Sequence, residues 1–149
     1  MKTTWRRLAG ERGTALLETA MTLPLLLLVS VGIFEFGRAY QTWQVLTNAA
    51  REGARVAVMP SSPPGAAEAR VRQYMRTGQL PDEAAATVAV DSAAVVSIGA
   101  GTATATIVTV NYPFPFIVLQ PVARLLLSGS TLGAPVTLTA SAEMRNEAQ

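Results

Sequence analysis

The chain has 149 residues, of which 50% are hydrophobic and only 15% carry a charge. This length suffices for one membrane helix and one small domain with its own core, and the composition argues against a disordered chain. Cysteine and histidine are both absent, which excludes disulfides, thiolate catalysis, histidine acid–base chemistry and Cys/His metal sites.

The positive charge is concentrated at the N-terminus. Residues 1–13 hold four basic residues against Glu11, a net charge of +3, so the rest of the chain carries −1. The sequence pI near 9.5 reflects this basic head. No basic patch interleaved with aromatic residues follows it, so we expect no nucleic-acid partner.

An apolar segment follows the basic head. No charge occurs from Thr19 to Phe34, and together with Thr14–Glu18 this gives a helix of roughly 20 residues, enough to cross a bilayer core of about 30 Å. Pro24 predicts a kink, because proline removes the amide bond to the carbonyl of Ala20. The positive-inside rule predicts a cytoplasmic N-terminus, with the chain after about Tyr40 on the opposite side.

Glu18 is the unusual residue of this segment. A charged side chain at the mouth of a membrane helix is costly and indicates a function. If a peptidase cuts after Gly13, Thr14 becomes the first residue and Glu18 the fifth. This spacing resembles that of type IV pilin-like precursors.

Three interpretations of the apolar segment are open at this point. In the first it is a signal anchor, and Glu18 is a tolerated charge near the headgroups. In the second it is a cleaved signal peptide, with Gly37-Arg38-Ala39 as a weak small-x-small site. In the third it is cut before the apolar residues, and the helix is kept.

The helix is expected to continue past the membrane. Five residues of Tyr40–Met59 recur at three- and four-residue spacing and predict an inward-facing stripe: Trp43, Leu46, Ala50, Ala54 and Ala57. Its small residues permit close approach to a sheet or another helix, and Glu52 can pair with Arg55 on the opposite side. The proline-rich stretch Met59–Gly65 ends the helix.

The next elements are a short helix and a hairpin. Ala66–Thr77 reads as an amphipathic helix that stops at Gly78. Thr87–Ile98, with a buried-looking Val95-Val96 pair, and Thr102–Tyr112 predict two strands joined by a turn at Gly99-Ala100-Gly101.

The C-terminal part is predicted to complete the sheet. Pro113-Phe114-Pro115-Phe116 is expected to break the second strand. Ile117–Leu127 is apolar but too short to span a membrane, which predicts a loop or short helix at the sheet edge, or an exposed contact patch. Pro135–Met144 alternates apolar and polar residues and predicts a third, half-buried strand.

These elements predict an α+β fold: a long N-terminal transmembrane helix continuing into a small domain with a three- or four-stranded antiparallel sheet, as in type IV pilin-like proteins. We expect residues 1–13 to be a cytoplasmic basic leader, 14–39 the transmembrane helix and 40–149 an exported domain. We find no repeat, phosphate-binding loop or nucleophile motif. No catalytic, cofactor or metal site is therefore expected, and the protein is not expected to be an enzyme.

Five stretches carry a likeness to a known family: Arg12–Glu18, Leu23–Leu27, Phe34–Arg38, Leu46–Arg55 and Thr139–Arg145. They resemble the TadE-like minor pilins, or pseudopilins, of the bacterial tight-adherence (Flp pilus) systems. The likeness is specific from residues 12 to 58 and loose from 59 to 138. Thr19 departs from the aromatic residue that often follows the glutamate.

The resemblance implies insertion in the bacterial inner membrane, cleavage after Gly13 by a prepilin peptidase, and a role in assembly of a type IVc pilus. The implied partners are membrane lipid, the peptidase, other pilins or pseudopilins, and the inner-membrane assembly platform. In such an assembly, Glu18 of one subunit pairs with the Thr14 ammonium of a neighbour inside an apolar bundle. The alternative is an uncleaved, single-pass binding module of the cell envelope.

Overall fold

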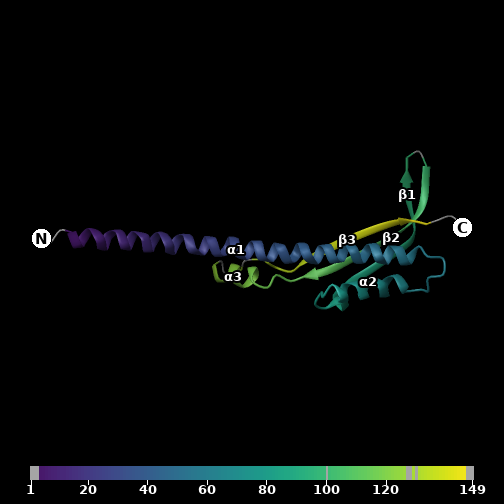
Figure 1. The fold of residues 1–149 in the computed structure, drawn as a ribbon. Helices are drawn as coiled ribbons and strands as arrows, with labels where there is room; N and C mark the ends of the chain where they lie inside the picture. The colour runs from purple at the N-terminus through teal and green to yellow at the C-terminus, as the bar shows by residue number, and fades with distance from the viewer. Residues whose placement is uncertain (1–3, 100, 127–128, 130, 147–149) are drawn as a thin grey trace. The chain divides into compact units, whose positions relative to one another are not determined.

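The computed structural model describes residues 4–99, 101–126, 129 and 131–146. In chain order these form helices α1 (Thr4–Ala57) and α2 (Ala66–Thr77), the 3-10 helix η1 (Glu83–Ala85), strands β1 (Thr87–Ile98) and β2 (Gly101–Phe114), helix α3 (Leu119–Leu126) and strand β3 (Val136–Arg145) (Figure 1). The predicted α+β class is confirmed. Residues 1–3 of the predicted leader, Ala100 of the predicted turn and Leu127 lie outside the described residues.

The chain divides into two compact units, and each contains a part of α1. We call residues 1–37 and 116–133 the helical unit, and residues 38–115 and 134–149 the sheet unit.

The sheet unit is built on an antiparallel sheet in the order β1-β2-β3. β1 pairs with β2 from Thr87 opposite Asn111 to Ile98 opposite Gly101. β2 pairs with β3 up to Phe114 opposite Val136. The three strands occupy the segments that the apolar alternation predicted.

The core of this unit lies between one face of the sheet and the second half of α1. Five alternate residues of β2 are buried: Thr106, Val108, Val110, Tyr112 and Phe114. On α1, Leu46, Ala49, Ala50 and Ala54 are fully buried. A Cβ at Gly53 would overlap Val71 of α2 and lie 3.3 Å from Cγ1 of Val108 on β2. The predicted close approach of a small-residue stripe to the sheet is confirmed.

The hairpin formed by β1 and β2 differs from the prediction at its far end. Val95, expected to be buried, is 72% exposed. A bulge between Asp91 and Ala94 shifts the register, which reverses the alternation of side chains beyond it. The bulge brings Val95 opposite Thr104, on the face of β2 that carries Thr106 and Val108. This pair lies beyond the end of the β2–β3 pairing at Ala105 and Arg145, and the side chain of Thr104 is exposed as well.

The second strand ends inside the predicted breaker Pro113–Phe116, but two residues later than predicted, because β2 continues through Pro113 and Phe114. Pro113 lies opposite Thr137 of β3, whereas the pairing with β1 ends at Thr87 and Asn111. Pro113 therefore lies beyond β1, and its missing N–H leaves no β1 carbonyl without a donor.

Trp43 is 41% exposed and does not belong to the buried stripe of α1. Its ring packs instead against Tyr40 of the same helix, with 6.2 Å between the ring centroids. Such tilted aromatic pairs at helical spacing are favourable in themselves. The buried stripe accordingly begins at Leu46.

Helix α1 is longer at its N-terminal end than predicted. It begins at Thr4, not near Gly13, and is assigned without a break through Pro24. Residues 5–9 include arginine, leucine and alanine, which favour helix. A kink at Pro24 stays a prediction.

Candidate membrane-anchor and assembly site

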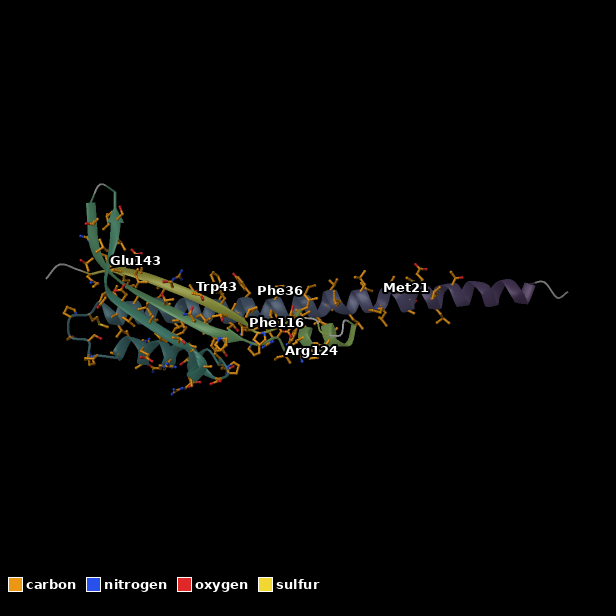
Figure 2. All side chains as sticks on the ribbon, turned by 180° about the vertical axis from the view of Figure 1, so that it is seen from behind. Met21, Phe36, Trp43, Phe116, Arg124 and Glu143 are labelled. Atoms are coloured by element: carbon orange, nitrogen blue, oxygen red, sulfur yellow. The ribbon has the colours of Figure 1, made fainter. Side chains whose placement is uncertain are left out.

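The first part of α1 presents an apolar surface to its surroundings. Every residue from Gly13 to Ser30 is exposed, including Leu16, Leu17, Met21, Leu23, Leu25, Leu26, Leu27, Leu28 and Val29. Met21 is labelled on this stretch of α1 in Figure 2. Contiguous apolar surface of this extent indicates contact with lipid or with another helix.

Gly13, Thr14 and Glu18 lie at the start of this apolar stretch. Apart from the neighbouring residues and the backbone of the helix itself, no heavy atom lies within 4 Å of the position that a Cβ on Gly13 would take, so a larger side chain would have open space there. Thr14 and Glu18 are exposed, and their four-residue spacing places them on the same face of the helix. The structure thus brings the predicted cleavage and assembly residues together.

The hydroxyl groups of the apolar stretch are satisfied inside the helix. Thr19 Oγ1 donates to the carbonyl of Ala15 at 2.8 Å, and Ser30 Oγ donates to that of Leu26 at 2.8 Å. Thr22 Oγ1 donates to the carbonyl of Glu18 at 2.9 Å. Hydroxyls bonded back to the preceding turn can face an apolar environment without water.

Glu35 is the buried charged residue of the helical unit, with 0% exposure. Its Oε1 atom accepts hydrogen bonds from the backbone N–H groups of Ile117 at 2.7 Å, Val118 at 2.5 Å and Leu119 at 3.4 Å. These amides lead into α3, whose N-terminus has no carbonyl partners for them and attracts negative charge. Glu35 therefore caps α3 from another helix.

This cap is a strong interaction between distant parts of the chain. Hydrogen bonds to a charged group contribute on the order of 1.5–3 kcal/mol each, about twice as much as neutral ones. The bond to Leu119 is long, so the two shorter bonds carry most of the effect. They tie residues 117 and 118 to the end of the uncharged stretch of α1.

A second close contact lies between Gly133, which follows α3 in the chain, and the start of α3. Gly133 has a φ of +75°, and a Cβ there would lie 2.6 Å from the backbone nitrogen of Gln120. Only glycine fits both the left-handed conformation and the close approach. The short helix expected as one possibility for Ile117–Leu127 is confirmed, and its start is fixed by Glu35.

The role of Glu35 was not predicted from the sequence. The bond between Glu35 and Ile117 joins residues 82 positions apart, and no local pattern signals such a pairing. One signal was present, since Glu35 is the first charge after the run Thr19–Phe34. A charge at this depth of a membrane helix needs a partner.

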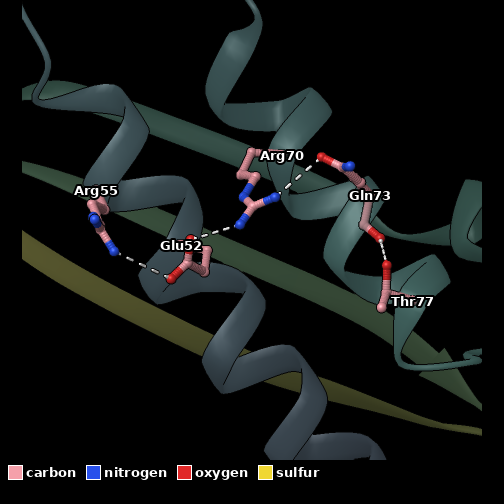
Figure 3. Close-up of polar contacts among 5 residues, drawn as sticks. All are labelled: Glu52, Arg55, Arg70, Gln73 and Thr77. Atoms are coloured by element: carbon pink, nitrogen blue, oxygen red, sulfur yellow. Dashed lines mark hydrogen bonds and ion pairs between the residues drawn. The ribbon is translucent and has the colours of Figure 1, made fainter.

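Polar contacts in the sheet unit connect α1 with α2 (Figure 3). Glu52 accepts a hydrogen bond from Arg70 at 3.0 Å and lies 3.9 Å from Arg55, so the pair expected at three-residue spacing is confirmed. Arg70 also donates to Gln73 at 3.2 Å. Such partly exposed pairs contribute little stability but fix the relative positions of side chains.

Two further contacts hold the loop between α2 and the sheet. Arg72 donates to Glu68 and to the carbonyls of Glu83 and Ala86. The hydrogen bond from the backbone N–H of Glu83, and then the one from Arg76, lower the pKa of its carboxyl group. These contacts belong to the scaffold of the sheet unit.

Tyr112 is buried and donates a hydrogen bond to the carbonyl of Pro81. Burial, and then the nearby Asp82 carboxylate, raise the pKa of the Tyr112 phenol. Beside it lies an apolar hollow of about 300 Å³, lined by Pro81, Asp82, Ala85, Tyr112, Pro113, Pro115 and Pro135. Asp82 and Tyr112 are the titratable side chains of this lining.

The described residues were also compared with the ligand sets of metal sites. No three or more His, Cys, Asp or Glu residues come together there in a way that could hold a metal ion.

The fold and the exposed helix define a class of protein: one N-terminal apolar helix that by length and composition can span a membrane, followed by a small α+β unit. Residues 13–55 match the sequence profile of the family described as TadE-like protein, which confirms the resemblance over this stretch. The match does not extend to Thr139–Arg145. No curated protein and no solved structure matches the chain.

Proposed function

We propose that the protein is a membrane-anchored minor pilin or pseudopilin that acts in assembly of a Flp/Tad-type pilus. The observation that carries this proposal is the TadE-like match over residues 13–55. The match begins at the proposed cleavage residue and includes Glu18 on the exposed apolar stretch of α1. A carboxylate on such a stretch is unfavourable in lipid and favours assembly, where it gains a partner.

In this proposal a prepilin peptidase cuts between Gly13 and Thr14. The cut removes the +3 head and leaves an ammonium group on Thr14. Thr14 and Glu18 lie one helical turn apart, so in a bundle the carboxylate of Glu18 in one subunit can pair with the Thr14 ammonium of a neighbouring subunit. Buried pairs of this kind act more as a device for register than as a source of net stability.

The proposed location is the inner membrane, with the basic head in the cytoplasm and the sheet unit outside. The partners are membrane lipid, the peptidase, other pilins or pseudopilins and the assembly platform. The protein supplies contacts and performs no catalysis. The alternative is an uncleaved single-pass binding module of the envelope.

The experiment that tests the proposal is N-terminal mass spectrometry of the protein extracted from membranes in cells that contain the cognate peptidase. A mature chain that begins at Thr14 supports the pilin-like function. A chain that keeps residues 1–13 in the presence of active peptidase contradicts it and favours the uncleaved module.

A further inference from the structure

We propose that residues 116–126, which contain α3 and are called here the α3 segment, form a second membrane-contacting element. They lie in the lipid interface beside the apolar part of α1, and Glu35 holds them there. This inference rests on the proposed membrane anchor, since the α3 segment reaches lipid only if α1 crosses the bilayer.

The length of the uncharged run is the first reason. Thr19–Phe34 comprises 16 residues, which span about 24 Å in a helix. The hydrocarbon core of a bilayer is about 30 Å thick. With Glu18 at one boundary, the lipid extends past Phe34, and Glu35 lies at the apolar edge of the opposite leaflet. A carboxylate at this depth must be shielded and hydrogen-bonded, as Glu35 is.

The backbone of the α3 segment is the second reason. Irregular chain at membrane depth is tolerated only where its polar groups are satisfied without water. Glu35 Oε1 accepts the N–H groups of residues 117–119. The next turn closes through Val122 N–H and the carbonyl of Val118 at 3.1 Å. The N–H groups of residues 117–119 and of Val122 are thus met by protein atoms.

The composition of the α3 segment is the third reason. It contains one charged residue, Arg124, and no acidic residue. Ile117 is 59% exposed, and Pro121 and Arg124 are exposed as well, with Arg124 labelled on α3 in Figure 2. An apolar surface with an arginine suits the headgroup boundary of a membrane with anionic lipids, where arginine keeps its charge in the polar layer.

Lipid is the occupant that these observations favour over another protein. The same compact unit also exposes Ile33, Phe34 and Phe36 of α1. The apolar side chains of the α3 segment therefore extend a surface that already belongs to the candidate membrane span. A peripheral helix that is apolar on one side and basic at its edge binds such an interface.

Single cysteine residues can locate the α3 segment, because the chain has no cysteine of its own. Ile117→Cys and Pro121→Cys probe the segment, Leu25→Cys probes the span, and Val95→Cys is an exposed apolar control in the sheet unit. Each full-length variant is labelled with bimane in liposomes of phosphatidylethanolamine and phosphatidylglycerol. Quenching by brominated lipid is compared with quenching by aqueous iodide.

We expect labels at residues 117 and 121 to be quenched by brominated lipid several-fold more than the label at residue 95, as at residue 25. If residue 25 is in lipid while 117 and 121 are quenched by iodide, the inference is wrong and the anchor stands. If the label at residue 25 is itself quenched by iodide, α1 does not span the membrane, and the proposed membrane anchor is contradicted together with the inference. Labels at 117 and 121 that neither agent reaches indicate a protein neighbour and overturn the lipid assignment.

The part played by Glu35 needs a separate pair of variants. One oxygen accepts all three bonds, so Glu35→Gln keeps an acceptor in place, whereas Glu35→Leu removes it. We expect Glu35→Leu to speed hydrogen exchange at the amides of Ile117 and Val118 by roughly tenfold or more. It also moves the residue-117 label toward water.

Glu35→Gln should reproduce most of the wild-type protection and lipid contact. Glu52→Leu, the same class of change elsewhere on α1, is the matched control and should leave both readouts at residue 117 unchanged. If Glu35→Leu also leaves both unchanged, Glu35 does not hold the α3 segment, and that part of the proposal is wrong.

Discussion

Two glutamates of α1 stand at opposite ends of the same uncharged run and have opposite surroundings. Glu35 is fully buried and bonded to the backbone of residues 117–119. Glu18 is exposed, so a second chain can reach it. Because an apolar environment disfavours an unpaired carboxylate, the first residue stabilises its own chain and the second is suited to assembly between chains.

Gly13→Leu should block cleavage by the prepilin peptidase. The site lies within the helix α1, which must unwind locally for cleavage, and glycine lowers the cost of leaving the helix by about 1 kcal/mol. Leucine removes this advantage and fills the space beside the bond. Immunoblotting and mass spectrometry of membranes should show only the precursor.

Gly32→Leu is the matched control for that substitution. Gly32 lies in the same helix, and its Cβ position is likewise open apart from the neighbouring residues and the backbone of the helix itself. It should be processed as the wild type is. Equal processing of Gly13→Leu and Gly32→Leu would count against a cut after Gly13.

Glu18→Ala should enter the membrane and be cleaved, but fail in assembly. Loss of the charge makes insertion easier, whereas the Thr14 ammonium of a neighbour loses its partner, at a cost of about 3–5 kcal/mol for a buried pair. This should reduce co-purification with pilins or the assembly platform by more than about tenfold. Ser30→Ala, which removes an exposed hydroxyl of the same helix, should assemble normally. Normal assembly of Glu18→Ala would leave Glu18 as a headgroup-level charge.

At the level of elements, the sequence pattern predicted those helix and strand bounds that depend on neighbouring residues in the chain. α2 and β1 begin and end at the predicted residues, because a proline-rich loop, Gly78 and the alternation of apolar residues mark them. The burial of Ala50 and Ala54 also followed from helical spacing.

The remaining features depend on partners far away in the sequence. β2 passes through Pro113 because β1 has already ended there, and Val95 is exposed because it pairs with β2 beyond the end of the β2–β3 pairing. The local sequence predicts neither feature. The cap of α3 by Glu35 also depends on a distant partner. Gly13 and Glu18 could be proposed from the sequence because their spacing is itself the signal.

Gly53→Leu should destabilise the sheet unit. A Cβ there already overlaps Val71, a buried β-branched residue with little rotamer freedom. Overpacking of this kind costs about 1–3 kcal/mol, which corresponds to a decrease in Tm of roughly 4–8 °C per kcal/mol for a unit of this size. Thermal unfolding in detergent tests this, with Gly32→Leu as the control at an open glycine. An unchanged Tm would show that α1 and α2 do not pack closely at Gly53.

Tyr112 should make the stability of the sheet unit sensitive to alkaline pH. Burial raises the pKa of the phenol in the folded state, so its contribution is complete below the ordinary value of about 10 and is lost as pH rises through the folded pKa. Tyr112→Phe should be about 1 kcal/mol less stable at neutral pH, because it loses the bond to Pro81. Urea unfolding across this pH range should show the difference between the two proteins shrinking. A constant difference would contradict the assignment.

At the scale of the whole molecule, charge and apolar surface separate along the chain. The first 13 residues carry a net charge of +3, the stretch 19–34 carries none, and the later residues are nearly balanced. This order predicts the orientation of the protein in a membrane, because basic residues next to a span stay on the cytoplasmic side.

Orientation can be tested in the Gly13→Leu background, in which the head is retained. Val95→Cys, on the exposed hairpin end of the sheet unit, should react with a membrane-impermeant maleimide in intact spheroplasts. Thr4→Cys, in the basic head, should react only after the membrane is permeabilised. The reverse pattern would place the sheet unit in the cytoplasm, where it could not contact an external pilus. Labelling of both sites in intact spheroplasts would show that α1 does not cross the membrane, which removes the physical basis for both the pilin-like function and the lipid contact of the α3 segment.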